Sequence, residues 1–450
     1  MLNNAWTIAI ETLSWIEMQR LSEHLALIKT IKQLNETNSN AIRYAYGLVV
    51  ETTRRRNLID KFINTAIAPK KIEEFNLGIQ SFLRLYVYQT RVTKNWDKYN
   101  IQEAKNIANT ARSILGWKTM IPVEPYLGFL LTQKIRPILE TSDEEERLSL
   151  ETFQQRWFVK YCINLLGSNE AALFLRASNT PPPAYIRINT LKGNLEETLQ
   201  KIATEGVKLQ KTEPLQQDVY KVLELKQPLH TLESFKLGLF YIQDKASCFA
   251  AQTAAPKSGN KILDICAAPG AKTTYLAQLM QNQGNILSVD FSKRRMKTWR
   301  QEINHMGVTI TEAVIANACL PLPITETVDL VVLDPPCTST GVFAKQPSAK
   351  WRLSKNSIEN MAEVQQQMIT NCAQHVVVGG HLIYSTCSIT VEENEMVIER
   401  FLAEHSNFRL DEITPEFGLP GLRGLTSCRR LYPHLHECTG FFIAKLKRVY

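Results

Sequence analysis

Regular alternation between apolar strand segments and helical segments is the strongest constraint in this sequence, and it extends from about residue 260 to the end of the chain. Strands separated by helices form a parallel sheet with helices on both of its faces. We predict strands over 261–265, 286–290, 309–315, 328–334, 381–385 and 441–445, with helices that start at 273, end at 303 and cover 358–376. Because ligands of such α/β sheets bind beyond the carboxyl ends of the strands, the residues that follow these strands are candidates for a functional site.

The residues before this region divide into two further parts. Up to about residue 150, apolar side chains such as Trp6, Ile10 and Leu13 recur at steps of three and four, which predicts a bundle of helices. The proline-rich stretch SNTPPPAY at 178–185 breaks this pattern. Short predicted strands and one helix follow it, which indicates a small α/β module. We therefore expect three domains, over residues 1–155, 156–235 and 236–450.

The composition narrows the class of protein. The 450 residues include 52 Lys and Arg against 44 Asp and Glu, and the net charge of +8 favours a polyanionic partner such as nucleic acid. The nine cysteines are scattered and form no Cys-x-x-Cys pair, which argues against a disulfide framework and a zinc ribbon and indicates a reducing compartment. Polar residues interrupt every apolar run in residues 1–20, so we expect a cytoplasmic protein without a signal peptide or membrane span.

Two basic groups each have two interpretations. The consecutive residues Arg54, Arg55 and Arg56 lie either on a solvated helix face or against RNA phosphates. Arg187 and Lys192, in the central module, either face RNA or are ordinary surface residues. The sequence alone does not decide between these interpretations.

A turn rich in small residues follows the first strand of the C-terminal region, in the stretch LDICAAPGAKTT at 263–274. Ala267, Ala268 and Gly270 let the backbone approach a ligand closely, and the helix that begins behind them favours an anionic group. The stretch matches neither GxGxxG nor a P-loop. Asp290 ends the next strand, where a carboxylate can bind the two ribose hydroxyls of a nucleoside cofactor. Taken alone, the stretch also fits a tight turn that binds no ligand.

Cysteines follow two further strands. Cys337 lies in LDPPCTSTG at 333–341, where Asp334 and two prolines predict a rigid turn, and Cys387 lies in LIYSTCS at 382–388. Because the carboxyl ends of parallel strands share one edge, both thiols are expected to face one cleft. A single cysteine is most often a buried structural residue. Two cysteines at the ends of strands in one sheet, beside a cofactor turn, favour a catalytic nucleophile.

These stretches resemble a known family, the RsmB/Nol1/Nop2/Sun-type RNA 5-methylcytosine methyltransferases. The resemblance covers nearly the whole chain, most strongly after residue 180. The matching stretches are YIRINTLKG at 185–193, YIQDKAS at 241–247, DICAAPGAKTT at 264–274, Asp290, DPPC at 334–337, PSAKW at 347–351, GGHLIYSTCSITVEENE at 379–395 and GFFIAKL at 440–446. The resemblance implies an α/β fold with a C-terminal Rossmann-like methyltransferase sheet, a small central RRM-like α/β module and an N-terminal all-α NusB-like bundle that binds RNA.

The resemblance also implies roles for individual residues, with S-adenosylmethionine as the cofactor. Cys387 is expected to add to C6 of a cytosine, Cys337 to assist product release, and Asp334 to bind N3 or the exocyclic amine of the base. The residues expected to bind S-adenosylmethionine are Cys266, Ala267, Ala268, Pro269, Gly270, Lys272, Asp290, Asn317 and Asp334. Two positions depart from the family: Asn317 stands where the family usually has Asp, and Ser339 stands where it frequently has Gly.

The expected reaction is methylation of C5 of a cytidine in RNA by a monomeric enzyme, and the NusB-like bundle favours ribosomal RNA of the 16S type as the substrate. The alternatives are a transfer-RNA cytosine-5 methyltransferase and a non-catalytic RNA-binding scaffold. A nicotinamide dehydrogenase is disfavoured because GxGxxG is absent, and an amino-group methyltransferase is disfavoured because it needs no thiol. A possible metal site is the trio His434, His436 and Cys438, whose alternation would place all three side chains on one face of a strand. The preferred interpretation is a strand that leads into GFFIAKL without such a role, and we expect no metal.

Overall fold

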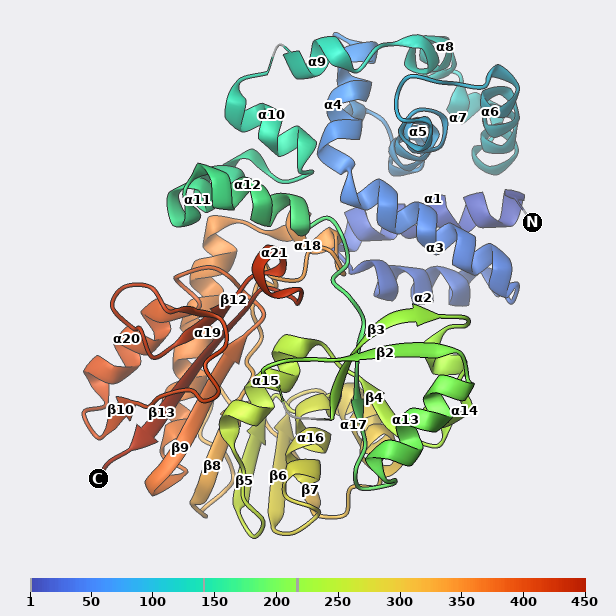
Figure 1. Cartoon of the computed structure of the whole chain (residues 1–450). Coiled ribbons are helices and arrows are strands. Elements are labelled where there is room, and N and C mark those ends of the chain that lie inside the picture. The colour runs from blue at the N-terminus through green and yellow to red at the C-terminus, as the bar shows by residue number, and fades with distance from the viewer. Residues whose placement is uncertain (1, 141, 216–217) are drawn as a thin grey trace. The chain divides into compact units, whose positions relative to one another are not determined.

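The computed structural model describes residues 2–140, 142–215 and 218–450, and these residues form two compact units (Figure 1). Unit 1 consists of the described residues up to 181 together with 343–352, and unit 2 consists of the described residues of 182–342 together with 353–450. The expected division into three domains stays a prediction. Among the described residues, no helix combines the length and the apolarity needed to cross a membrane.

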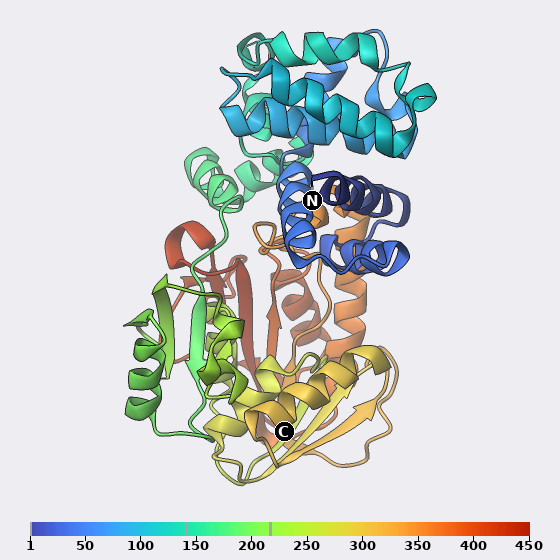
Figure 2. The same cartoon turned by 90° about the vertical axis from the view of Figure 1, so that its right-hand side faces the viewer.

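The regular structure of unit 1 is helical, and both views show it as coiled ribbons (Figures 1 and 2). Its α-helices are α1 (Leu2–Gln19), α2 (Glu23–Leu34), α3 (Ser39–Arg54), α4 (Arg56–Ile67), α5 (Leu77–Thr90), α6 (Ile101–Leu115), α7 (Trp117–Met120), α8 (Glu124–Thr132), α9 (Arg136–Glu140), α10 (Glu144–Glu151), α11 (Arg156–Leu166), α12 (Ser168–Ala177) and α18 (Ser348–Arg352), with 3-10 turns η1 (Ile72–Glu74) and η2 (Val92–Lys94). Helix α5 packs against α1, α3, α4, α6 and α8, and it buries Phe82 and Tyr86 in the core. The predicted helical bundle is therefore present.

The three consecutive arginines make ion pairs inside unit 1. Arg54 is buried and pairs with Glu51 at 3.1 Å, and Arg55 pairs with the same carboxylate. Arg56 pairs with Glu17 at 2.9 Å. The solvated helix face is therefore wrong for Arg54, and because each guanidinium has a carboxylate partner, the structure does not favour a row of phosphate contacts.

Residues 343–352 belong to unit 1 through buried polar contacts, although the sequence places them inside the predicted third domain. The Ser348 hydroxyl donates to the carboxylate that begins α2, at 2.8 Å. Lys350 is only 1% exposed, and its Nζ donates to the carbonyl of Phe153 at 3.0 Å and to Oδ1 of Asn179 at 2.9 Å. Burial lowers the pKa of Lys350. A segment that follows a predicted active-site cysteine in sequence is thus part of the helical unit.

Unit 2 begins with a four-stranded antiparallel sheet in the order β2-β3-β1-β4. Its elements are β1 (Tyr185–Ile188), α13 (Leu195–Thr204), β2 (Val207–Lys211), β3 (Val219–Leu225), η3 (Leu229–Thr231), α14 (Glu233–Lys236) and β4 (Phe240–Ile242). Arg187 in β1 is fully buried; its Nη2 donates to Thr274 Oγ1 at 2.9 Å, and its guanidinium lies 4.4 Å from the centre of the Tyr275 ring. Both interpretations of Arg187, as an RNA contact and as a surface residue, are therefore wrong.

The second sheet of unit 2 has nine strands, eight of them in the order β11-β12-β13-β9-β8-β5-β6-β7, with β10 paired to β13. The strands are β5 (Lys261–Ile265), β6 (Asn285–Asp290), β7 (Thr311–Ile315), β8 (Val328–Leu333), β9 (Val376–Thr386), β10 (Phe408–Leu410), β11 (Leu419–Pro420), β12 (Arg429–Leu431) and β13 (Phe441–Arg448). Strands β5 to β9 are parallel, as predicted. The expectation of a wholly parallel sheet is wrong for β13, which pairs antiparallel with β9, β10 and β12.

Alternating side chains of the parallel strands pack on opposite faces of this sheet. The helices are α15 (Lys245–Ala254), α16 (Ala271–Leu279), α17 (Lys293–Met306), α19 (Lys355–Ala373), α20 (Glu395–Glu404) and the single turn α21 (Pro433–His436). Ile262 of β5 packs in the core formed with α15, α16 and α17, whereas its neighbour Leu263 packs in the core formed with α19 and α20. Both faces are covered, so the free edge at the carboxyl ends of the strands is where a site can form.

Candidate active site

The predicted site residues lie in loops at the carboxyl ends of neighbouring strands. The turn at 266–270 follows β5, Asp290 ends β6, Asp334 follows β8, and Cys387 follows β9. These strands are adjacent in the sheet and run in the same direction, so their carboxyl ends meet at one edge. The topology alone therefore brings together residues that are far apart in sequence.

The small-residue turn after β5 uses backbone conformations that explain its composition. Cys266 has φ +62° and Gly270 has φ +116°, both in the left-handed region, and helix α16 begins directly after Gly270. A Cβ on Gly270 would lie 3.3 Å from the Trp299 ring, which is closer than ordinary packing. Pro269 and the alanines between them complete a tight strand-to-helix connection that starts a helix at the sheet edge.

Asp290 is buried beside this turn and accepts hydrogen bonds from the backbone N–H of Ala268 at 3.3 Å and of Ser292 at 2.9 Å. Arg295 lies 3.3 Å from the same carboxylate and also donates to the carbonyl of Ala268. A buried carboxylate fixed in this way is a fitting acceptor for ligand hydroxyls. Asn317 follows β7 and is exposed, and its Oδ1 accepts a hydrogen bond from the Cys319 N–H at 3.0 Å.

The two cysteines are in contact. The Sγ atoms of Cys337 and Cys387 are 3.1 Å apart, and Cys387 Sγ lies 3.8 Å from Ser339 Oγ. The hydrogen bond from the Cys337 thiol lowers the pKa of Cys387; Ser339 and Lys272 act in the same direction, whereas burial and Asp334 oppose it. The same bond, together with burial, raises the pKa of Cys337. The arrangement therefore favours a thiolate at Cys387 and a protonated thiol at Cys337.

Ser339 shows why glycine suits this turn. Its φ is +60°, in the left-handed region that a glycine adopts at little cost and a serine at more. The serine hydroxyl in turn lies near the Cys387 sulfur. The departure from the family's frequent glycine thus keeps the backbone conformation and adds a polar contact.

Lys272 links the small-residue turn to the residues before Cys337. It is buried in α16, and its Nζ pairs with the Asp334 carboxylate, which also accepts from Ser385 Oγ at 3.4 Å. The Lys272 ammonium lies 5.6 Å from the centre of the Phe441 ring. One ion pair therefore joins the predicted cofactor side of the edge to the cysteine side.

The structure adds functional candidates that the sequence reasoning missed. Glu393 lies in the matching stretch at 379–395 but was assigned no role, yet it is fully buried among hydroxyl groups near both cysteines. Gly341 and Gly440 were not singled out, yet their backbones touch, with the N–H of Gly440 donating to the carbonyl of Gly341 at 2.9 Å. The run of Ser and Thr residues that precedes Glu393 is the one sequence signal that could have indicated a buried polar network.

The strand expected around His434, His436 and Cys438 is wrong. Pro433–His436 form the helical turn α21, so the three side chains do not alternate along a strand. The Tyr432 N–H lies 3.0 Å from the Nδ1 atom of His436, and Cys438 is buried. Within the part of the chain that the structure describes, no cluster of His, Cys, Asp and Glu side chains is suited to hold a metal ion.

The sequence matches known families over most of its length. Residues 251–447 match the family described as 16S rRNA methyltransferase RsmB/F, and residues 154–230 match the ferredoxin-like domain of RsmF/B-like methyltransferases. The probable ribosomal RNA small subunit methyltransferase B of Bacillus subtilis (strain 168) is 30% identical over 452 residues, which cover 98% of this chain and 98% of that protein. The 25S rRNA (cytosine-C(5))-methyltransferase nop2 of Schizosaccharomyces pombe is 33% identical, covering 65% of this chain and 51% of that protein.

Solved structures of similar proteins also superimpose on this chain. The crystal structure of PH0851 superimposes with a TM-score of 0.84 at 28% identity, covering 100% of this chain and 99% of that chain. NSun6 from Pyrococcus horikoshii, crystallised with the S-adenosylmethionine analogue SFG, superimposes with a TM-score of 0.61 at 26% identity and covers 65% of this chain and 97% of that chain. With a relative that matches nearly the full length of both sequences, the chain belongs to the RsmB/F family of S-adenosylmethionine-dependent RNA cytosine-C5 methyltransferases.

Proposed function

We propose that this enzyme transfers a methyl group from S-adenosylmethionine to C5 of a cytidine in small-subunit ribosomal RNA. The observation that carries the proposal is the 3.1 Å contact between the thiols of Cys337 and Cys387, at the sheet edge that also holds Asp334 and the small-residue turn. Small-subunit RNA is favoured because the relative that matches 98% of this chain is named for it. The tRNA (cytosine(72)-C(5))-methyltransferase of Pyrococcus horikoshii matches 49% of this chain, and transfer RNA is therefore the alternative substrate.

A thiolate is needed because C5 of cytosine is a weak nucleophile. Cys387 adds to C6 and forms an S–C6 bond, and the electron pair of the C5=C6 bond becomes available at C5. S-adenosylmethionine, when bound, would supply the methyl group that C5 accepts, and S-adenosylhomocysteine would leave with the electron pair of the broken S–CH₃ bond. A base, for which solvent water is sufficient, then takes the C5 proton. The electron pair of the C5–H bond forms the C5=C6 bond again, and the S–C6 bond breaks with its pair on the Cys387 sulfur.

Cys337 is suited to assist this last step. Its sulfur lies 3.1 Å from the Cys387 sulfur, and the hydrogen bond between them and burial raise the pKa of Cys337. A thiol that keeps its proton can donate a hydrogen bond to the sulfur that leaves C6. We therefore assign attack to Cys387 and release to Cys337.

Asp334 is proposed to bind the base. Its carboxylate is fixed by Lys272 and Ser385, and it faces the same edge as the two thiols. A carboxylate there accepts a hydrogen bond from the exocyclic amine or from a protonated N3, and it favours the protonated form of the base as negative charge develops on the ring. The shared partner Lys272 connects base binding with the cofactor side.

The loops after β5, β6 and β7 fit S-adenosylmethionine. The small-residue turn at 266–270 gives a ligand access to the backbone, and the buried Asp290 carboxylate suits ribose hydroxyls. Asn317 after β7 is proposed to lie on the adenine side, with an amide in place of the family's carboxylate. Cys266, Ala267, Ala268, Pro269, Gly270 and Lys272 complete the proposed binding residues.

The accessory parts are proposed to supply affinity for RNA. Moving a target base out of its stack costs a few kcal/mol of free energy, and several phosphate contacts can offset this cost. The helical bundle of unit 1, which we propose to be NusB-like, and the antiparallel sheet of unit 2 are the parts of the chain outside the methyltransferase sheet. The net charge of +8 favours such phosphate contacts.

The test is methyl transfer by the full-length protein to unmodified transcripts of small-subunit ribosomal RNA, large-subunit ribosomal RNA and transfer RNA, with bisulfite sequencing to map 5-methylcytidine. We expect label from S-adenosylmethionine at one cytidine of the small-subunit transcript. Labelling of transfer RNA alone would replace the substrate assignment, and methylation at a base atom other than C5 would overturn the proposed chemistry.

A further inference from the structure

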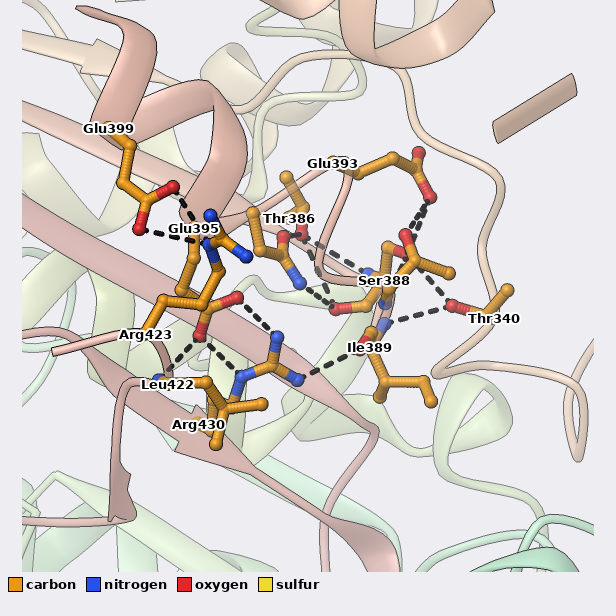
Figure 3. Close-up of polar contacts among 12 residues, drawn as sticks. Thr340, Thr386, Ser388, Ile389, Glu393, Glu395, Glu399, Leu422, Arg423 and Arg430 are labelled. Carbon is orange, nitrogen blue, oxygen red and sulfur yellow. Dashed lines mark hydrogen bonds and ion pairs between the residues drawn. The ribbon is translucent and has the colours of Figure 1, made fainter. Parts of the chain in front are cut away.

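A buried carboxylate lies between the two cysteine loops. Glu393 is 0% exposed, and its Oε2 accepts a hydrogen bond from the Ser388 hydroxyl at 2.6 Å (Figure 3). The same oxygen accepts from the hydroxyls of Thr390 at 2.7 Å and Thr338. Its Oε1 accepts from the backbone N–H of Thr338 at 2.7 Å and from the amide of Gln365 at 3.1 Å. Five donors therefore converge on one side chain that can only accept when it is a carboxylate.

The hydrogen count shows that the network is specific for a carboxylate. Each hydroxyl has one proton, and Ser388 and Thr390 direct theirs at Glu393. The 2.8 Å contact between Thr340 and Ser388 is therefore donated by Thr340, whose oxygen accepts from the Ile389 N–H at 2.8 Å (Figure 3). A glutamine at 393 would turn its NH₂ either against the backbone N–H of Thr338 or toward three hydroxyl protons, so it cannot satisfy the same donors.

Four of the five donors come from the two loops that carry the cysteines, and the fifth, Gln365, lies in α19. We call residues 334–341 the Cys337 turn and residues 387–394 the Cys387 turn. Thr338 directly follows Cys337, and Ser388 directly follows Cys387, so the Glu393 carboxylate bonds the residue next to each thiol. The backbone adds a second link, because the N–H of Gly341 donates to the carbonyl of Cys387 at 2.9 Å.

We propose that Glu393 is a positioning residue, which holds the Cys337 turn and the Cys387 turn in register so that the two sulfurs remain in contact. The proposal deepens the proposed function and rests on its assignment of attack and release to these two thiols. Glu393 does not touch the reacting base; it acts through the residues next to the thiols.

Loss of this register changes the acid strength of the thiols. The charged groups around the pair are Lys272 and Asp334 beside Cys387, and Glu393 beside Cys337. The bond from Cys337 is the largest cause that lowers the pKa of Cys387, and the Glu393 charge contributes to the raised pKa of Cys337. When the turns separate, Cys387 loses its donor, and its pKa rises toward the ordinary value of a thiol.

The first experiment measures the pH dependence of Cys387 alkylation by iodoacetamide in the full-length protein, with peptide mass spectrometry to distinguish it from the other cysteines. We expect Glu393→Gln to move the midpoint for Cys387 upward by about one pH unit, the size of one lost hydrogen bond to a charged group. Glu395→Gln is the matched control, since Glu395 is equally buried but bonds Arg430 and the Leu422 N–H instead of the cysteine turns (Figure 3). It should lower the thermal midpoint without moving the alkylation midpoint.

A second pair of variants covers the case in which Glu393→Gln does not fold. Thr338→Val and Thr390→Val each remove one hydroxyl donor from Glu393, but Thr338 belongs to the opposite turn, whereas Thr390 lies three residues from Glu393 in its own turn. We expect Thr338→Val to raise the Cys387 midpoint and Thr390→Val to raise it less than half as far. Equal shifts for these two variants, or an unchanged midpoint in folded Glu393→Gln, would overturn the proposal. The alkylation measurement needs no RNA, so its outcome is independent of the proposed function. Methylation that persists in Cys387→Ala would refute the proposed thiol chemistry separately.

Discussion

The Cys337 turn and the Cys387 turn follow neighbouring parallel strands and carry sulfurs that touch, but they are held in different ways. The Cys387 turn leads directly into α20, and its polar contacts lie within unit 2. The chain after the Cys337 turn instead supplies residues 343–352 to unit 1 and returns to unit 2 at Leu353. The thiol assigned to attack is thus held by contacts within unit 2, whereas the thiol assigned to release is followed by a segment that is anchored in unit 1.

The largest effect is expected where the two turns share backbone contacts. Gly341→Ala would place a Cβ 2.1 Å from the carbonyl oxygen of Gly440, and a shift of the Gly341 backbone would disturb its hydrogen bonds with Cys387 and Gly440. We expect the free energy of unfolding to fall by about 4 kcal/mol or more, with loss of methylation. Chemical denaturation and methyl transfer measure this.

Gly47→Ala is the control, because nothing lies within 4 Å of the added Cβ in helix α3. That variant should be as stable as the parent or more stable by about 0.5–1 kcal/mol. A stable, active Gly341→Ala would show that the two turns do not need their close contact.

A second prediction concerns Asp264, which is, like Glu393, a buried carboxylate and lies near the end of β5. Asp264 is 1% exposed and accepts from Thr273 Oγ1 at 2.5 Å, and burial, the largest cause, raises its pKa to about 7. Between about pH 4 and pH 7 the unfolded chain releases this proton while the folded chain keeps it, so the stability of the fold decreases as pH rises. The decrease amounts to at most about 4 kcal/mol for a shift of three units.

Asp264→Asn should remove this slope, because a neutral amide does not titrate. Urea denaturation at pH 5 and pH 8 gives the difference between the parent and the variant at each pH. The variant should gain stability relative to the parent at pH 8. The same difference at both values of pH would mean that Asp264 is ionised in the folded protein throughout this range, as a well-satisfied carboxylate is.

A third and smaller effect is expected when the buried contacts that hold residues 343–352 in unit 1 are removed. Lys350→Met leaves the carbonyl of Phe153 and the amide oxygen of Asn179 without the Lys350 donor, and we expect a loss of about 2–3 kcal/mol in the free energy of unfolding. The covalent RNA adduct should persist longer in this variant, because the Cys337 side is disturbed, while the rate of adduct formation changes less.

Lys355→Met, at an exposed position at the start of α19, is the comparison for that variant. It should match the parent in stability and in adduct lifetime. If Lys350→Met slows adduct formation and leaves its lifetime unchanged, the anchored segment does not act on the release side.

Much of the fold was predictable because the pattern of apolar side chains along a strand indicates which of its faces are buried. Strand β5 has the predicted bounds, and the small-residue turn and both cysteines lie at the carboxyl ends of the parallel strands as expected. The antiparallel direction of β13 was not predictable, since a strand buried on both faces has the same apolar pattern in either direction.

The parts of the site that the sequence did not show depend on contacts between distant residues. Glu393 bonds Thr338 across 55 residues, and Lys350 bonds Asn179 across 171. A buried Glu or Lys is rare unless it is paired, so exposure is the default expectation for either. Only the fold shows that their partners are present, so the sequence alone assigned no role to either residue.

The most direct test of the account is a denaturing gel of labelled RNA incubated with S-adenosylmethionine and either cysteine variant of the full-length protein. Cys387→Ala should form no covalent adduct and transfer no methyl group, because no thiolate remains to attack C6. Cys337→Ala should methylate and then remain attached to the RNA as an adduct that survives denaturation. An adduct from Cys387→Ala with none from Cys337→Ala would show that the two roles are reversed, and full activity of both variants without an adduct would contradict thiol catalysis in this enzyme.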